Sequence, residues 1–196
     1  MRTRLLVVAV FTALLLPAPA SARTTAPDHA RSGAIVTVEH LMFMPGVAKV
    51  ALGDAVTWNF PEVTPHTTTS DQGFWDSGAK SGDASYVHTF TSAGTFAYHC
   101  SIHSTMHGKV SVGLRVAVPT EGKRIVRWST VKGSGTITFD VQMKIGSAPW
   151  TDLRTDTTKP KATVRPFGDA PVKIRARTSK GAQDSGWSKP VTLRFA

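Results

Sequence analysis

Short runs rich in valine, isoleucine and threonine recur along this chain, and clusters of glycine, aspartate and serine separate them. Residues 35–38, 50–52 and 55–58 are three such runs, and Gly53-Asp54 between the last two predicts a hairpin-type turn. Apolar residues nowhere recur at helical spacing over three turns. The sequence therefore predicts an all-β chain of antiparallel sandwiches or barrels.

The same pattern continues to the end of the chain. Further strands are expected at residues 67–70, 85–90, 94–99 and 109–112 in the first half, and at 125–128, 136–141, 172–176 and 191–195 in the second. A Pro119-Thr120-Glu121-Gly122 segment separates the two halves. No short repeat indicates a solenoid, so we expect two sandwiches in series.

The first 22 residues have the layout of a secretory signal peptide. Two arginines precede an apolar run at residues 5–16, and Ala20-Ser21-Ala22 is a typical cleavage site. This run is shorter than the roughly 20 residues that span a bilayer, and no later run is longer, so we expect no transmembrane segment. The mature protein is expected to be secreted, periplasmic or held at the cell surface, with residues 23–32 as a leader.

Charge divides the mature chain unevenly. Residues 23–118 carry six Lys/Arg against seven Asp/Glu, whereas residues 119–196 carry fifteen against six, within a formal net charge of +10 for the whole chain. This split predicts a near-neutral domain over residues 33–118 and a basic domain over residues 119–196. Only the basic domain has reason to bind an anionic partner such as a cell-envelope surface, and nucleic acid is not an expected partner outside the cell.

Residues with metal-binding chemistry gather near position 100. Cys100 is the only cysteine, which excludes an intrachain disulfide. Together with His103 and Met106 it forms a Cys-x-x-His-x-x-Met array at the end of an expected strand. One thiolate, one imidazole and one thioether in a tight loop can point inward together, and this donor set suits a soft metal ion.

A second imidazole would complete the plane of two His and one Cys, with a weak axial Met, that is diagnostic of type 1 copper. His66 is the obvious supplier, because loops at one end of a Greek key sandwich converge even when they are far apart in sequence. Zinc prefers sites without a thioether, and iron–sulfur clusters need more cysteines than this chain has. Copper is the metal that the sequence predicts.

The first half of the chain resembles the cupredoxins, the small blue copper proteins that include plastocyanin, pseudoazurin and amicyanin. The resemblance rests on segments, found in the same order, at residues 43–45, 53–58, 65–67, 86–90, 94–96, 98–106 and 108–110. The two-residue gap between His103 and Met106 looks like the short loop of amicyanin. In one departure, Thr67 stands where the family often has Asn.

This resemblance implies a Greek key sandwich with one type 1 copper per chain. His66, Cys100 and His103 would be the equatorial ligands of the copper, and Met106 would be its axial ligand. The exposed ring edge of His103 would then exchange electrons with redox partner proteins, whose identity the sequence does not give.

His99 directly precedes the cysteine, as histidines do in larger copper enzymes. Multicopper oxidases would require a histidine in place of Ser101 and His-x-His pairs elsewhere, and the chain has neither. Copper nitrite reductases have a further histidine where Asp71 stands here. Strand alternation turns His99 away from Cys100, so we expect it at the surface. The other histidines are expected to be structural or exposed, and they are His29, His40, His88 and His107.

The second half resembles a fibronectin type III domain. Arg127-Trp128 fits strand B with its tryptophan, residues 139–142 fit strand C, and residues 172–177 and 185–188 fit strand F and the entry to strand G. Ala170 stands where that family usually has a tyrosine. Because such folds host many binding roles, the resemblance implies no particular ligand.

Two hypotheses of function follow. The first is an exported blue copper protein, not an enzyme, that carries electrons between redox partners and uses its basic sandwich for surface or partner attachment. The second is a copper sequestration or delivery protein with the same ligands but without electron-transfer turnover. The closed set of two His, one Cys and one Met favours the first, because copper-exchange proteins favour open sites rich in Met or His.

Overall fold

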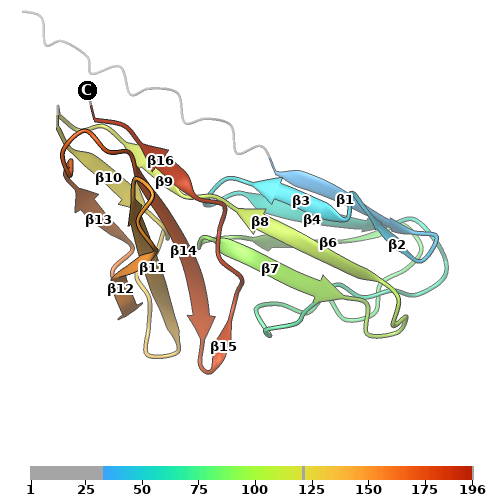
Figure 1. Cartoon of the computed structure of the whole chain (residues 1–196). Coiled ribbons are helices and arrows are strands. Elements are labelled where there is room, and N and C mark those ends of the chain that lie inside the picture. The colour runs from blue at the N-terminus through green and yellow to red at the C-terminus, as the bar shows by residue number, and fades with distance from the viewer. Residues whose placement is uncertain (1–32, 121, 196) are drawn as a thin grey trace, which may run out of the picture.

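The computed structural model describes residues 33–120 and 122–195, and every regular element in this part of the chain is a β-strand. The first eight strands form one sandwich and the last eight form a second (Figure 1). The predicted all-β class with two sandwiches is confirmed. The predicted signal peptide at residues 1–22 and the leader at 23–32 lie outside the described residues. No helix among the described residues is long and apolar enough to cross a membrane.

The strands of the first sandwich are β1 (Ala34–Glu39), β2 (Met42–Met44), β3 (Val47–Val50), β4 (Ala55–Phe60), β5 (Thr69–Ser70), β6 (Ala84–Thr89), β7 (Gly94–His99) and β8 (His107–Val112). They form two four-stranded sheets, in the orders β2-β1-β4-β6 and β3-β8-β7-β5. Buried side chains alternate with outward ones, as in β4, where Val56, Trp58 and Phe60 are buried. The core therefore lies between the two sheets.

Two strand pairs of this sandwich are parallel, β1 with β4 and β3 with β8, so the expectation of antiparallel sheets is wrong for them. The predicted turn at Gly53-Asp54 forms, since the Asp54 N–H donates to the Ala51 carbonyl at 3.1 Å. It does not close a hairpin, because β3 and β4 lie in opposite sheets, where β3 pairs with β8 and β4 pairs with β1 and β6. Alternation of apolar residues predicts which face of a strand is buried, but not which strand lies beside it.

A cluster of aromatic side chains fills the middle of this core. The Tyr98 ring stands edge-on to Trp58, with 5.6 Å between ring centroids, and also contacts Trp75. Burial raises the pKa of Tyr98 to about 12. On the neighbouring strand, Gly108 is the register partner of Tyr98, and a Cβ at position 108 would overlap the tyrosine ring. A residue without a side chain is therefore required there.

We expect Gly108→Ala to lower the free energy of unfolding by about 1–3 kcal/mol, the usual cost of overpacking a core. The Tyr98 ring is held by other aromatic side chains and cannot move aside without displacing them. Denaturant unfolding of the metal-free protein measures the loss. Gly113→Ala is the matched control, because an added Cβ there meets no atom within 4 Å. Equal losses in the two variants would contradict this packing argument.

The strands of the second sandwich are β9 (Arg115–Ala117), β10 (Arg124–Arg127), β11 (Ile137–Ile145), β12 (Thr151–Thr157), β13 (Lys161–Val164), β14 (Val172–Lys180), β15 (Gln183–Asp184) and β16 (Val191–Leu193). One sheet has the order β13-β10-β9, and the other has the order β12-β11-β14-β15, with β16 also paired to β14. Because β9 pairs with β10, the chain passes from the first sandwich to the second between β8 and β9. The expected division lies slightly later, between residues 118 and 119.

Backbone hydrogen bonds join the two sandwiches near the start of β7. Thr95 and Gly186 exchange two N–H···O bonds of 2.8 Å, and the Ala93 N–H donates to the Trp128 carbonyl at 2.8 Å. The buried hydroxyl of Thr178 donates to the Ala93 carbonyl at 2.9 Å. These bonds give the second sandwich a set position against one end of the first.

Candidate metal centre

Strand β7 leads from the junction between the sandwiches to the opposite end of the first one (Figure 1). Phe96 and Tyr98 point inward and are buried, and the same alternation turns Cys100 inward and His99 outward. The chain then turns back into β8 through residues 100–106, which we call the ligand loop. His66 lies shortly before β5, the strand that pairs with β7, so pairing brings it beside Cys100.

Three of the four predicted ligands converge at this end. The Cys100 Sγ lies 4.0 Å from Nδ1 of His66 and 3.6 Å from Nδ1 of His103, and the two Nδ1 atoms are 3.1 Å apart. His66 and Cys100 are 0% and 1% exposed, whereas His103 is half-buried. Among the described residues, this is the one group of three or more His, Cys, Asp or Glu donors close enough to share a metal ion.

The separations between these donors fit a trigonal metal centre. A metal about 2.0 Å from each nitrogen and about 2.3 Å from the sulfur, in one plane, sets the nitrogens about 3.5 Å apart and each about 3.7 Å from the sulfur. The observed separations of 3.1, 3.6 and 4.0 Å scatter around these values. A thiolate with two imidazoles at this spacing is a donor set that suits copper.

Met106 closes the ligand loop through its backbone. The Cys100 N–H donates to the Met106 carbonyl at 3.1 Å, and the Met106 N–H donates to the His103 carbonyl at 3.2 Å. The Met106 side chain is buried, with 1% of its surface exposed. These bonds keep the three loop residues in one tight turn, and the axial role of the Met106 thioether stays a prediction.

Thr67 connects the His66 segment to the ligand loop. Its N–H donates to the Cys100 Sγ at 3.3 Å, and its hydroxyl oxygen accepts the Ser101 N–H at 2.8 Å and the Thr69 hydroxyl at 3.0 Å. Thr67, the residue that departs from the family pattern, thus contacts the Cys100 sulfur and holds Ser101, the residue that follows Cys100. Both contacts restrict movement of the Cys100 thiolate.

Glu62 is a residue of the site that the sequence analysis missed. Its Oε2 lies 3.5 Å from Nε2 of His66, on the far side of the ring from the other donors, and its Oε1 accepts the His40 N–H at 3.1 Å. His66 Nε2 has no hydrogen-bond partner among the described residues, so Glu62 contacts the ring as a neighbouring negative charge and not through a hydrogen bond. The spacing of four residues between Glu62 and His66 is the sequence signal that could have indicated it.

His99 stands apart from this group. Its Nδ1 lies 2.7 Å from Asp71 Oδ1, and about a third of its side chain is exposed. Asp71, at the position where a nitrite reductase would need a histidine, is therefore a partner of His99. His40 and His107 are exposed, and the His107 Nε2 lies 3.0 Å from the Ser104 carbonyl oxygen.

His88 is stacked on Trp75, with 5.3 Å between ring centroids, and meets Phe90 edge-on at 4.9 Å. Burial lowers the pKa of His88 below its usual value of 6.5. The unfolded chain therefore takes up this proton at a higher pH than the folded protein does. The contribution of His88 to stability is present above pH 6.5 and is lost as the pH falls from there toward the lowered pKa.

We expect His88→Phe to keep the ring stacking and remove this part of the pH dependence. As the pH is lowered from 7.5 to 5.5, the thermal midpoint of the wild type should decrease relative to that of the variant. Thermal unfolding in matched buffers measures the difference. A constant offset between the two proteins across this range would show that His88 does not titrate with folding.

Comparisons with known proteins assign this site to a family. A family model described as copper binding proteins, plastocyanin/azurin family, matches residues 32–113. Amicyanin of Paracoccus denitrificans is 32% identical over 99 residues, which cover 48% of this chain and 76% of amicyanin. The chain belongs to the plastocyanin/azurin family of copper-binding proteins.

Other relatives of this cupredoxin match a similar share of the chain. Amicyanin of Paracoccus versutus is 30% identical over 92 residues, which cover 44% of this chain and 70% of that amicyanin. A solved structure of an oxidized amicyanin variant is 30% identical, with a TM-score of 0.39 over 41% of this chain and 81% of the variant. Copper is therefore the cofactor of the first domain, and the group of His66, Cys100 and His103 is the candidate to hold it.

Proposed function

We propose that this cupredoxin is an exported electron carrier, not an enzyme, with one type 1 copper per chain. His66, Cys100 and His103 would hold the copper in a plane, and Met106 would be its axial ligand. The observation that carries the proposal is the convergence of two imidazole nitrogens and one cysteine sulfur within 4.0 Å at the buried end of β7. Bound copper would supply a one-electron Cu(II)/Cu(I) couple.

In this function the role of the polypeptide is to hold the copper-binding side chains in place while the charge of the copper changes. The Thr67 N–H and hydroxyl fix Cys100 and Ser101, and the turn bonds of Met106 fix the ligand loop. Donors that keep their places make the structural reorganisation between the two charge states small, and fast electron exchange follows.

Burial of the donors supports a carrier rather than an enzyme. His66, Cys100 and Met106 are each at most 1% exposed, so these side chains present almost no surface to a substrate. A catalytic metal site normally keeps one coordination position free for water or substrate. Electrons, unlike substrates, can pass through the edge of a ligand, and the half-buried His103 is the exposed member of the set.

Apolar side chains around this end of the sandwich would form a docking patch for redox partners. β2 and the ligand loop lie at the same end of the first domain (Figure 1). Large hydrophobic side chains with 38% to 88% of their surface exposed come from β2, from the loop before His66 and from the ligand loop, and they are Met42, Met44, Val63 and Ile102. A small apolar patch of this kind suits a weak, quickly dissociating complex.

Copper sequestration or delivery is the competing function, and a cycling experiment separates the two. The copper-loaded protein would be reduced with ascorbate and reoxidised with ferricyanide several times in the presence of a Cu(I) chelator. A carrier keeps its copper and regains its visible absorption in each cycle. Loss of copper to the chelator on the first reduction would favour delivery and contradict the proposal.

We also propose that the second sandwich is fibronectin type III-like. A three-stranded sheet faces a larger one, and Trp128, directly after the second strand of the domain, is fully buried between them. This placement supports the strand B position of the tryptophan. The proposed export rests on the signal-peptide pattern of residues 1–22.

A further inference from the structure

The two sheets of the second sandwich differ sharply in charge. The strands of the sheet β13-β10-β9 contain no Asp or Glu, and their charged residues are Arg115, Arg124, Arg127 and Lys161. The strands of the opposite sheet mix cations with aspartates, which are Asp140, Asp152, Asp156 and Asp184. The strands of β13-β10-β9 therefore carry four cations and no anion, whereas the strands of the opposite sheet carry six cations and four aspartates.

The strand register places like charges side by side on the outer face of β13-β10-β9. Val126 and Trp128 are buried, so Arg127 between them faces outward. Arg127 stands directly opposite Arg115 on one neighbouring strand and directly opposite Lys161 on the other. Neighbouring strands are only about 4.8 Å apart, so this row holds three cations within about 10 Å.

The same face continues beyond this row. Arg124 begins β10 and is the register partner of Val164, which ends β13, so Lys123 and Arg165 adjoin this pair just beyond the two strands. Lys123 lies four residues before Arg127 and Arg165 lies four residues after Lys161, and with this even spacing continued strand alternation would put both on the same side as Arg127 and Lys161. We call the five cations of the two rows the basic face, and they are Arg115, Lys123, Arg127, Lys161 and Arg165.

Nothing in the described part of the chain neutralises the basic face. No carboxylate lies within 4.0 Å of its cations, since the only described Lys or Arg in an ion pair is Arg177. Arg115 and Arg127 donate to the backbone carbonyls of Leu52 and Ser129, which leaves their charge in place. Like charges directly opposite each other destabilise a sheet, so an anion outside the chain would relieve this repulsion.

Two arginines of the opposite sheet, by contrast, have partners within the chain that compensate their charge. Arg177 lies 2.8 Å from carboxylate oxygens of both Asp140 and Asp184. The Arg175 guanidinium lies over the rings of Trp150 and Trp187, at 4.3 and 4.6 Å from their centroids. Arg175 and Arg177 thus have compensating partners within the chain, whereas no cation of the basic face has a carboxylate or an aromatic ring as its partner among the described residues.

We propose that the basic face binds the anionic headgroups of a lipid bilayer and anchors the protein to a membrane surface. Two rows of cations on one side of a sheet form a two-dimensional array, which matches a plane of headgroups better than a single linear polyanion. The proposal deepens the attachment role of the second sandwich and rests on the proposed export, but not on copper chemistry.

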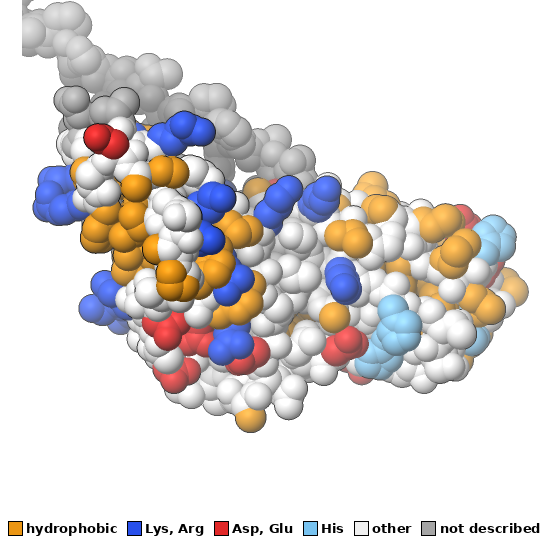
Figure 2. Space-filling model, in the orientation of Figure 1, with side chains coloured by type: hydrophobic (Ala, Val, Ile, Leu, Met, Phe, Trp, Pro, Cys, Tyr) orange, Lys and Arg blue, Asp and Glu red, His pale blue; other side chains and the backbone are white. Residues whose placement is uncertain are grey.

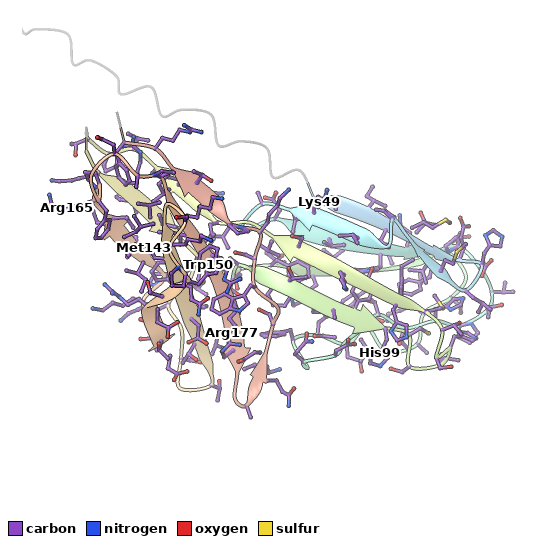
Figure 3. The ribbon with its side chains drawn as sticks, viewed as in Figure 1. Lys49, His99, Met143, Trp150, Arg165 and Arg177 are labelled. Carbon is purple, nitrogen blue, oxygen red and sulfur yellow. The ribbon has the colours of Figure 1, made fainter. Side chains whose placement is uncertain are left out.

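The basic face is far from the copper end. Arg165, which follows β13, and His99, which precedes Cys100, lie at opposite ends of the molecule (Figure 3). Lys and Arg side chains project from the end formed by the second sandwich, and histidines gather at the other end (Figure 2). Because backbone bonds fix the two sandwiches to each other, a bilayer bound to the basic face leaves the ligand loop open to soluble redox partners.

Vesicle co-sedimentation of the full mature chain tests this proposal. Vesicles of phosphatidylglycerol mixed into phosphatidylcholine would be compared with pure phosphatidylcholine, and the metal-free protein would be used so that failure of the copper assignment does not affect the result. We expect binding to the anionic vesicles alone. It should weaken steeply as salt is raised from 0.01 M, where the screening length is about 30 Å, to 0.3 M.

Two triple variants with the same change of net charge locate the binding face. Lys123→Gln, Lys161→Gln and Arg165→Gln together should lower the partition coefficient by about 100-fold, at roughly fivefold for each cation near the surface. The control, Lys144→Gln, Arg154→Gln and Lys173→Gln together, removes as many cations from the opposite sheet and should lower it by less than about fivefold. Thermal unfolding checks that both variants fold.

Equal losses in the two triple variants would overturn the proposal, because binding would then depend on net charge alone. An absence of binding to anionic vesicles at 0.01 M salt would also overturn it. A third arm uses inorganic polyphosphate in solution. If polyphosphate binds more tightly than the vesicles and the basic-face variant loses only that binding, the partner is a soluble polyanion and the lipid assignment is wrong.

Discussion

Cys100→Ser is expected to abolish the visible absorption of the copper-loaded protein while leaving it folded. In the proposed site the intense blue colour arises from charge transfer between the cysteine thiolate and Cu(II), and a hydroxyl cannot replace this donor. The substitution removes one buried sulfur that is 1% exposed and accepts the Thr67 N–H, so its effect on packing is small beside its effect on the metal. An absorption spectrum after copper loading measures the result.

Ser104→Ala is the matched control for this prediction. Ser104 is an exposed residue of the same ligand loop, and its side chain lies outside the donor group. The control should keep its colour and its copper content. A wild-type band that survives in Cys100→Ser would mean that the thiolate is not a ligand.

Met106→Gln is expected to lower the reduction potential of the copper by at least about 59 mV, a tenfold change in the Cu(II)/Cu(I) equilibrium. A thioether binds Cu(I) better than Cu(II), whereas the amide oxygen of glutamine is a harder ligand that favours Cu(II). The site should stay occupied and coloured, because the two imidazoles and the thiolate remain. Voltammetry of the two proteins at the same pH measures the shift.

Met44→Gln gives the comparison, since Met44 is 38% exposed on β2 and lies outside the ligand loop. Its potential should stay within a few millivolts of the wild-type value. An unchanged or raised potential in Met106→Gln would show that Met106 is not the axial ligand, even if the other three donors hold copper.

The sequence was sufficient to predict the local parts of the metal site. Strand alternation through residues 94–99 predicts that Cys100 points inward and His99 outward, and the structure places them so. The spacing of Cys100, His103 and Met106 predicts one tight loop, and the turn bonds of Met106 form it. These features depend only on residues close together in the chain.

Features that depend on distant residues were harder to predict. The parallel pairing of β3 with β8 joins segments about 60 positions apart, and no local pattern specifies it. The Glu62 contact with His66 was missed because a carboxylate four residues before a histidine is also an ordinary surface pattern. The bond from Ser101 to the Thr67 hydroxyl likewise spans 34 positions.

The second sandwich was predicted with less detail because its edge strands lack a clear apolar pattern. The sequence Thr-Asp-Leu-Arg-Thr-Asp-Thr of β12 is mostly exposed and was not recognised as a strand, since it pairs with β11 alone. β9 and β13 were missed for the same reason, and both flank β10. Charge counts predicted a basic domain, but only the strand register shows that Arg115, Arg127 and Lys161 stand side by side.

We propose that this cupredoxin holds one redox-active type 1 copper. The most direct test is a stoichiometric redox titration of the copper-loaded wild type, followed by visible absorption and electron paramagnetic resonance. We expect one copper per chain, an intense blue band, and reversible loss of this band on the uptake of one electron per copper. A correctly folded, copper-loaded protein that is colourless, or a band that does not respond to reduction, would contradict it.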